Sequence, residues 1–267
     1  MIRDITIGQY YSTDSLIHRL DPRTKILWAV FYMILLFVIN SPASYITVIL
    51  MTAFIIKLSK VPLKFILRGL KPIVIIVIFT ALLNLFMTKG DTEVFSKGIF
   101  TITAEGIYMA AKMAIRIILL ILGTSLLTFT TTPTVLTGGL EVLLKPLKKI
   151  GVPVSVFVMM MSIALRFIPT LLDETDKIIK AQTSRGADFE HGNPIKRVKA
   201  MLPILIPLFV SAFRRADELA IAMECRSYNS ESERTSYRRF AFGKADLYAL
   251  IFSILVCAVI IVLKVVL

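Results

Sequence analysis

Two short tracts place an arginine directly after a long amphipathic segment. Residues 180–186 are Lys-Ala-Gln-Thr-Ser-Arg-Gly, and residues 222–228 are Ala-Met-Glu-Cys-Arg-Ser-Tyr. Glycine tolerates the left-handed conformation just past a helix end, so Arg185, followed by Gly186, is predicted in the last helical turn. Arg226, between Cys225 and Ser227, is predicted in the equivalent place.

An arginine at this position complements the negative end of the helix dipole, which is a common structural role. Its guanidinium also suits bidentate pairing with a carboxylate of a partner. Either tract alone favours the structural role. The presence of both, in one protein with no other evident chemistry, favours two docking points for partner proteins.

Two further cations lie inside an apolar segment. Lys112 and Arg116 are four residues apart and therefore share one face of a helix. Charges inside a membrane span are costly and usually face other helices or a polar cavity. Two interpretations remain open: a contact with a partner subunit or a lipid phosphate, or a helix that begins later and leaves both residues at the interface.

Motifs for catalysis, nucleotide binding and metal binding are missing from the sequence. It has no Gly-x-x-x-x-Gly-Lys-[Ser/Thr], no His-Glu-x-x-His, no Cys-x-x-Cys and no Gly-x-Ser-x-Gly. The only histidines, His18 and His191, have no second ligand at suitable spacing, and the only cysteines are Cys225 and Cys257. We therefore predict no catalytic residue, no metal site and no cofactor.

The composition identifies the class of protein. The 267 residues are 56% hydrophobic, the mean hydropathy is +0.78, and apolar runs recur along the chain. This pattern is typical of a membrane protein. The net charge of +13 lies between the apolar runs, as the positive-inside rule requires, so lipid headgroups and acidic partners are favoured over nucleic acid.

The apolar runs predict an all-α, polytopic membrane protein with about five spans. The basic stretch 57–71 is expected in the cytoplasm and the near-neutral stretch 88–105 outside, which puts the N-terminus inside. The first two spans are short, so a hairpin that only partly enters the membrane is the alternative. The predicted spans are residues 22–39, 45–56, 73–87, 106–131 and 245–263. The first is expected to start with Asp21 as N-cap and Pro22 at the first helical position, and the third is expected to be opened by Pro72.

Residues 132–244 are predicted to form a cytoplasmic domain of long amphipathic helices, flanked by an N-terminal transmembrane region, 1–131, and a C-terminal span, 245–267. Leucine, isoleucine, valine and methionine recur there at helical spacing among charges of both signs. The predicted helices cover residues 133–149, 153–186 and 193–227. The first is expected to stop at Gly151, and the last has Asn193 as N-cap and Pro194 in its first turn.

The arginine tracts and the lead-in together resemble the T component of energy-coupling factor transporters. Residues 14–25, Asp-Ser-Leu-Ile-His-Arg-Leu-Asp-Pro-Arg-Thr-Lys, are similar to that family's N-terminal signature, Ser-x-x-His-x-Leu-Asp-Pro-Arg-x-Lys. The tracts ending Ser184-Arg185-Gly186 and Cys225-Arg226-Ser227 resemble its two Ala-Arg-Gly motifs. Cys225 and Ser227 stand where alanine and glycine are usual.

The resemblance implies a coupling subunit without catalytic activity, in the cell membrane of a prokaryote. Its two arginine motifs would bind two homologous cytoplasmic ATPases, which bind the ATP. It would also hold a small membrane-embedded subunit that binds a vitamin or another micronutrient. The alternatives are an autonomous transporter or channel, and an integral membrane enzyme acting on lipid.

Overall fold

The computed structural model describes residues 10–88, 93–97, 100–187, 189, 194–229 and 240–266. His191 and Asn193 lie outside these residues, so what the sequence predicts about them stays a prediction. The chain divides into two compact units, each described here by itself. One comprises residues 8–143 and 240–267, called the membrane unit, and the other comprises residues 1–7 and 144–239, called the lever unit.

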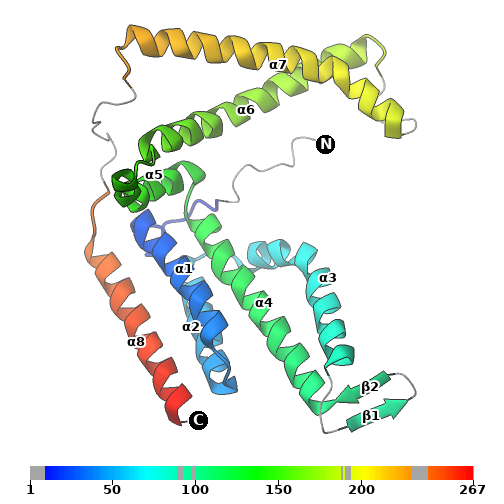
Figure 1. The fold of residues 1–267 in the computed structure, drawn as a ribbon, viewed down its shortest axis with the longest axis vertical. Coiled ribbons are helices and arrows are strands. Elements are labelled where there is room, and N and C mark those ends of the chain that lie inside the picture. Colours follow the sequence, from blue (N-terminus) through cyan, green and yellow to red (C-terminus); the bar gives the residue numbers. More distant parts are fainter. Residues whose placement is uncertain are drawn as a thin grey trace. The chain divides into compact units, whose positions relative to one another are not determined.

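The membrane unit consists mainly of helices (Figure 1). Its first helix starts as predicted, because the Asp21 side chain accepts a hydrogen bond from the Arg23 backbone N–H and Pro22 occupies the first turn. The helices are α1 (Pro22–Val38), α2 (Pro42–Ser59), α3 (Leu63–Met87), α4 (Ala104–Thr130), α5 (Pro133–Leu144) and α8 (Lys244–Val266).

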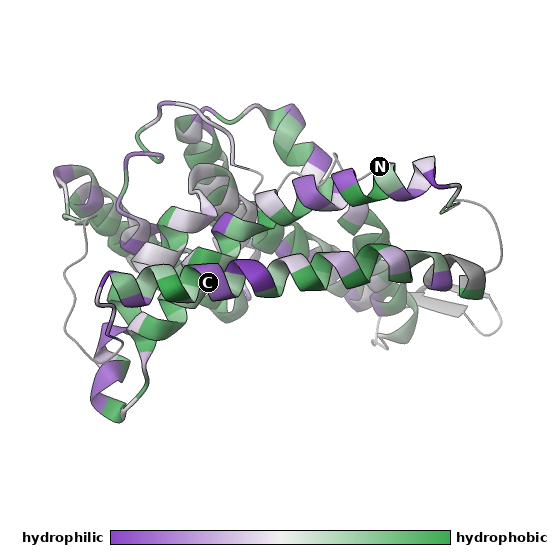
Figure 2. Ribbon diagram, turned by 90° about the horizontal axis from the view of Figure 1, so that it is seen from above, coloured by the Kyte–Doolittle hydropathy of each residue, from purple (hydrophilic) through white to green (hydrophobic). Residues whose placement is uncertain are grey.

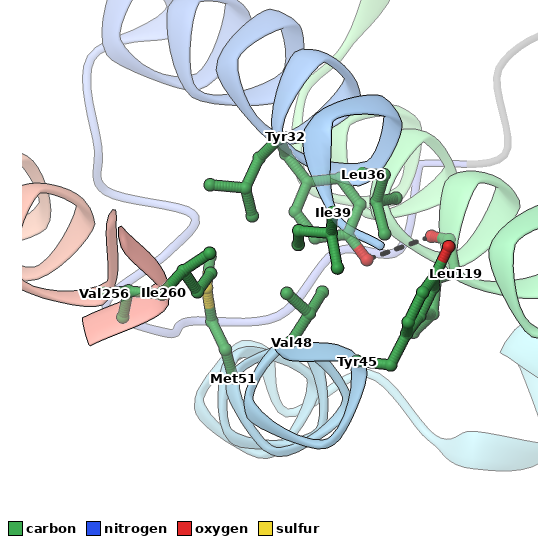
Figure 3. Packing of buried hydrophobic residues seen from close by; sticks show 10 residues of the cluster. Tyr32, Leu36, Ile39, Tyr45, Val48, Met51, Leu119, Val256 and Ile260 are labelled. Atoms are coloured by element: carbon green, nitrogen blue, oxygen red, sulfur yellow. Dashed lines mark hydrogen bonds between the residues drawn. The ribbon is translucent and has the colours of Figure 1, made fainter. Parts of the chain in front are cut away.

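The main core of the membrane unit lies between α1, α2, α4 and α8 (Figure 3). Tyr32 is fully buried there, and its hydroxyl donates to the Leu119 carbonyl oxygen at 3.1 Å. It also contacts the Thr52 hydroxyl at 2.9 Å. These bonds satisfy the polar end of a large aromatic side chain, so Tyr32 stabilises contacts among three helices.

The third helix begins earlier than predicted. The sequence indicated a basic loop up to Lys71 and a helix opened by Pro72, but α3 starts at Leu63 and contains Pro72. The basic residues Lys64 and Arg68 therefore lie on the first turns of a helix. One proline removes one helical hydrogen bond, which a long helix tolerates.

The connection between α3 and α4 contains a short antiparallel hairpin. Strand β1 (Glu93–Lys97) pairs with β2 (Phe100–Thr103), with Glu93 opposite Thr103. The sequence predicted only an irregular near-neutral loop here. Alternation of apolar and polar residues over four or five positions is too short to indicate strands reliably.

Five helices among the described residues are long and apolar enough to cross a membrane. Four of them, α2, α3, α4 and α8, correspond to predicted spans. The fifth is α6 (Val154–Ser184), which we assigned to the cytoplasmic domain, whereas α1 has 17 residues and is too short for this criterion. The apolar first half of α6 accounts for its inclusion, because Arg166 is the only charged residue there and the other charges lie in the second half.

The lever unit is built on two helices, α6 and α7 (Pro194–Cys225), which pack against each other and follow the short 3-10 helix η2 (Lys145–Ile150). Gly151, with a φ of 87°, ends η2 as the sequence predicted. Both hydrophilic and hydrophobic residues occur along the two long helices (Figure 2). Most of α5, predicted as part of the cytoplasmic domain, is grouped with the membrane unit.

Candidate functional site

Helix α6 ends in a Schellman motif centred on Gly186. The backbone N–H of Ala187 donates to the Gln182 carbonyl oxygen at 3.0 Å, and that of Gly186 donates to the Thr183 carbonyl oxygen at 2.9 Å. Gly186 has a φ of 88°, the left-handed conformation that this motif requires. Arg185, which immediately precedes it, is exposed at the helix end.

Helix α7 ends with the same hydrogen bonds. The backbone N–H of Tyr228 donates to the Met223 carbonyl oxygen at 3.0 Å, and that of Ser227 donates to the Glu224 carbonyl oxygen at 2.8 Å. Ser227 has a φ of 54° and therefore takes the position that Gly186 has in α6. Arg226 is exposed and occupies the position of Arg185.

The two ends show that a serine does not prevent this helix stop. A left-handed L-residue costs roughly 1–2 kcal/mol, which the two closing hydrogen bonds offset. Figure 1 shows α6 and α7 crossing, with the C-terminal ends of the two helices at opposite ends of the pair. The lever unit thus presents two exposed guanidinium groups in the same local geometry, at two separate places.

A polar cluster joins the two long helices between these ends. The Arg215 guanidinium donates to one Glu174 carboxylate oxygen at 3.0 Å, and the Ser211 hydroxyl donates to the other. None of these three residues was predicted as a site residue from the sequence. Glu174 and Arg215 are 41 positions apart, so no local pattern indicates their pairing.

Lys112 and Arg116 bind groups of the α1–α2 turn. The Lys112 ammonium donates to the Asn40 side-chain oxygen at 3.1 Å, and Arg116 donates to the Ile39 carbonyl oxygen at 3.0 Å. The Arg116 Nε also donates to the Tyr45 hydroxyl at 2.9 Å. Both positive charges therefore lie next to the negative end of the α1 helix dipole. The contact of these two residues with a partner subunit or a lipid stays a prediction.

The lead-in signature folds into a bonded turn around His18. Its Nε2 donates to the Tyr11 carbonyl oxygen at 3.0 Å, which leaves Nδ1 to accept from the Ser15 hydroxyl at 2.7 Å. The Ser15 oxygen in turn accepts from the His18 backbone N–H. Burial lowers the pKa of His18, and the neutral ring is the form that fits these partners.

The end of the same signature joins three helices. The buried Lys25 ammonium donates to the Thr130 carbonyl oxygen at 3.0 Å and the Thr131 hydroxyl at 3.2 Å, both at the end of α4. The Asp21 backbone N–H donates to the Asp246 carboxylate of α8 at 2.9 Å. The sequence identified these residues only as part of a motif. The structure shows that they hold the start of α1 against the end of α4 and the start of α8 by hydrogen bonds.

The described residues contain no group of three or more histidine, cysteine, aspartate or glutamate side chains that could hold a metal ion. Cys225 and Cys257 are free thiols. The fold and the site together define a polytopic helical membrane protein with two exposed, arginine-bearing helix ends.

Comparison with known proteins identifies the family. The model of the cobalt transport protein family matches residues 13–237. The energy-coupling factor transporter transmembrane protein of Ruminiclostridium cellulolyticum is 58% identical over 92% of this chain and 92% of its own length. That of Bacillus subtilis is 45% identical over 99% of this chain and 100% of its own. The chain belongs to the transmembrane components of energy-coupling factor transporters, as the sequence motifs predicted.

Proposed function

We propose that this chain couples two cytoplasmic ATPases to a small membrane subunit that binds a vitamin or another micronutrient for import. The observation that carries the proposal is the identical closure of α6 and α7, with Arg185 and Arg226 at matching positions. Arg185 and Arg226, each at the C-terminal end of its helix, are called the arginine tips. Two equivalent tips suit two homologous partners. Residues 184–186 and 225–227 would form the two contacts.

The chemistry of the tips favours a carboxylate-lined groove on each ATPase. Both guanidinium groups are exposed and protrude at a helix end, where the planar fork can pair with a carboxylate in two hydrogen bonds. The C-terminal ends of α6 and α7 lie at opposite ends of the crossed pair, which allows both ATPases to bind together. ATP would be held by these partners.

Movement of the ATPases would pass through the lever unit as a rigid-body shift. The Glu174, Ser211 and Arg215 cluster supports this, because it joins α6 to α7 between the tips. A displacement of the arginine end of either helix then also moves the helix that it is bonded to. The membrane partner would be reoriented by these linked helices.

The proposed topology has the N-terminus and the lever unit in the cytoplasm of a prokaryote. Basic residues from the last turn of α2 to the middle of α3 favour this orientation, including Lys57, Lys60 and Lys64. The two relatives named above are bacterial proteins. Nothing in the described residues favours a lipid-modifying enzyme or an autonomous channel over the coupling role.

Co-purification tests the proposal directly. The full chain, tagged and co-expressed with a pair of homologous ATPases from the same genome, is expected to retain both through detergent extraction. Absence of association with every ATPase pair tried, while the chain itself is folded and inserted, would overturn the proposal. Reporter fusions at Lys97 and Leu267 check the topology, with an external signal expected at both positions.

A further inference from the structure

An apolar cavity of about 390 Å³ lies inside the membrane unit, within the size range of small-molecule sites. The lead-in, α1, α2, α4 and α8 all line it. Its walls are formed largely by hydrophobic side chains, among them Trp28, Phe54, Leu126 and Phe252. An occupant of the interior must therefore be apolar.

Lys25 is the one cation that lines this cavity among the described residues, and groups of the chain already accept its hydrogen bonds. The Lys25 ammonium donates to the carbonyl oxygens of His18 and Thr130 and to the Thr131 hydroxyl. It has three protons to donate and three acceptors. The interior therefore has no ammonium proton left for an anionic head, which must lie elsewhere.

A second, more polar depression adjoins the cavity. The two share Leu16, Phe54 and Leu58 as lining residues. The depression is also lined by exposed Lys57 and Lys60 and by Arg19, whose guanidinium pairs with Asp14. Because that pair neutralises itself, the depression carries a net charge of about +2 from the two lysines.

We propose that the cavity and the depression together bind one anionic phospholipid. An acyl chain occupies the cavity beside Trp28, and the phosphate lies against Lys57 and Lys60. The continuity of an apolar interior with a cationic rim matches the amphiphilic shape and charge of such a lipid. A zwitterionic lipid offers the same chains without the net negative charge, so the lysines confer selectivity for the anionic one.

Trp28 provides the probe, since it is the only tryptophan of the chain. The full chain is reconstituted in nanodiscs of phosphatidylcholine with rising fractions of phosphatidylglycerol brominated on its acyl chains. Bromine quenches tryptophan fluorescence at short range. Half-maximal quenching is expected at a much lower fraction of brominated phosphatidylglycerol than of brominated phosphatidylcholine.

Removal of the two lysine charges tests the role of the depression in binding the phosphate. Replacing Lys57 and Lys60 by glutamine is expected to weaken the preference about fivefold for each lysine. The matched control replaces Lys64 and Lys71, which are nearby cations that do not line the depression, and is expected to keep the preference.

Three results would overturn the lipid site. The first is equal quenching by the two lipids in the wild-type chain. The second is an equal loss of preference in the control, which would indicate general surface charge. The third is no quenching by either lipid, the result expected if a protein segment fills the cavity.

Discussion

The ring of Tyr32 occupies the space in which a side chain at position 123 would lie. A Cβ built on Gly123 would be 2.2 Å from the Tyr32 Cε1 atom, far inside van der Waals contact. This close approach lets the Tyr32 hydroxyl reach the Leu119 carbonyl oxygen on the same helix. The absence of a side chain at Gly123 therefore sets the distance between α1 and α4.

Gly123→Ala is expected to destabilise the protein by about 1–3 kcal/mol, because the buried ring cannot move without disturbing the core. Thermal unfolding in detergent measures the effect. Gly69→Ala in α3 is the matched control, since its added Cβ would meet nothing closer than 3.7 Å. Equal melting temperatures for the two variants would contradict the packing argument.

Ser227→Gly and Gly186→Ala are expected to have opposite effects on the two helix ends. Glycine at position 227 removes the strain of an L-residue in the left-handed conformation, which stabilises the helix end by about 1 kcal/mol. Alanine at position 186 introduces the same strain at the end of α6. Hydrogen exchange of the amides at Ser227 and Tyr228, and at Gly186 and Ala187, reports each closure separately. Faster exchange in Ser227→Gly would show that the serine makes a contribution beyond its backbone geometry.

Replacing Arg185 and Arg226 together by alanine is expected to abolish ATPase assembly, since a lost buried charge pair costs about 2–5 kcal/mol at each contact. Retention of the ATPases on the tagged chain measures this. Arg214→Ala removes an exposed arginine from the middle of α7 and serves as the control. Wild-type assembly and uptake by the double variant would exclude the assigned role.

Glu174→Ala is expected to separate ATP hydrolysis from import. The variant loses both carboxylate bonds between α6 and α7 but keeps both arginine tips, so ATPases still bind. The stability cost is expected to be about 1 kcal/mol or less, because the ion pair is partly exposed. Uptake per ATP hydrolysed in proteoliposomes is the measurement, and Glu218→Ala, on the exposed surface of α7, is the control. An unchanged ratio would mean that this cluster does not transmit the movement.

His18 is expected to make the lead-in sensitive to acid. Its pKa is lowered below the ordinary 6.5, chiefly by burial, so the folded state favours the neutral ring. The resulting stability is fully present above pH 6.5 and is lost as the pH falls through the lowered pKa. Melting temperature against pH is the measurement. His18→Gln should flatten the acid side of that curve, and an identical curve would assign the sensitivity to other groups.

Much of the fold could be predicted because its signals are local. Asp21 and Pro22 predicted the start of α1, and Gly151 and Gly186 predicted helix ends, since capping depends on a few adjacent residues. The start of α3 was predicted wrongly at Pro72. Proline was taken as a helix opener, but the helix that begins at Leu63 continues through it.

Composition, short motifs and capping residues were enough to predict the class of protein, the family and the two arginine-bearing helix ends, because none of these signals depends on tertiary contacts. How the two helix ends are joined and what the lead-in does became visible only in the packing of the helices. Glu174 meets Arg215 across 41 positions, and Lys25 meets Thr130 across 105. Such pairs form when helices pack, and no spacing within one helix encodes them. The apolar cavity beside Trp28 also forms only when the helices pack, because its walls come from segments far apart in the chain.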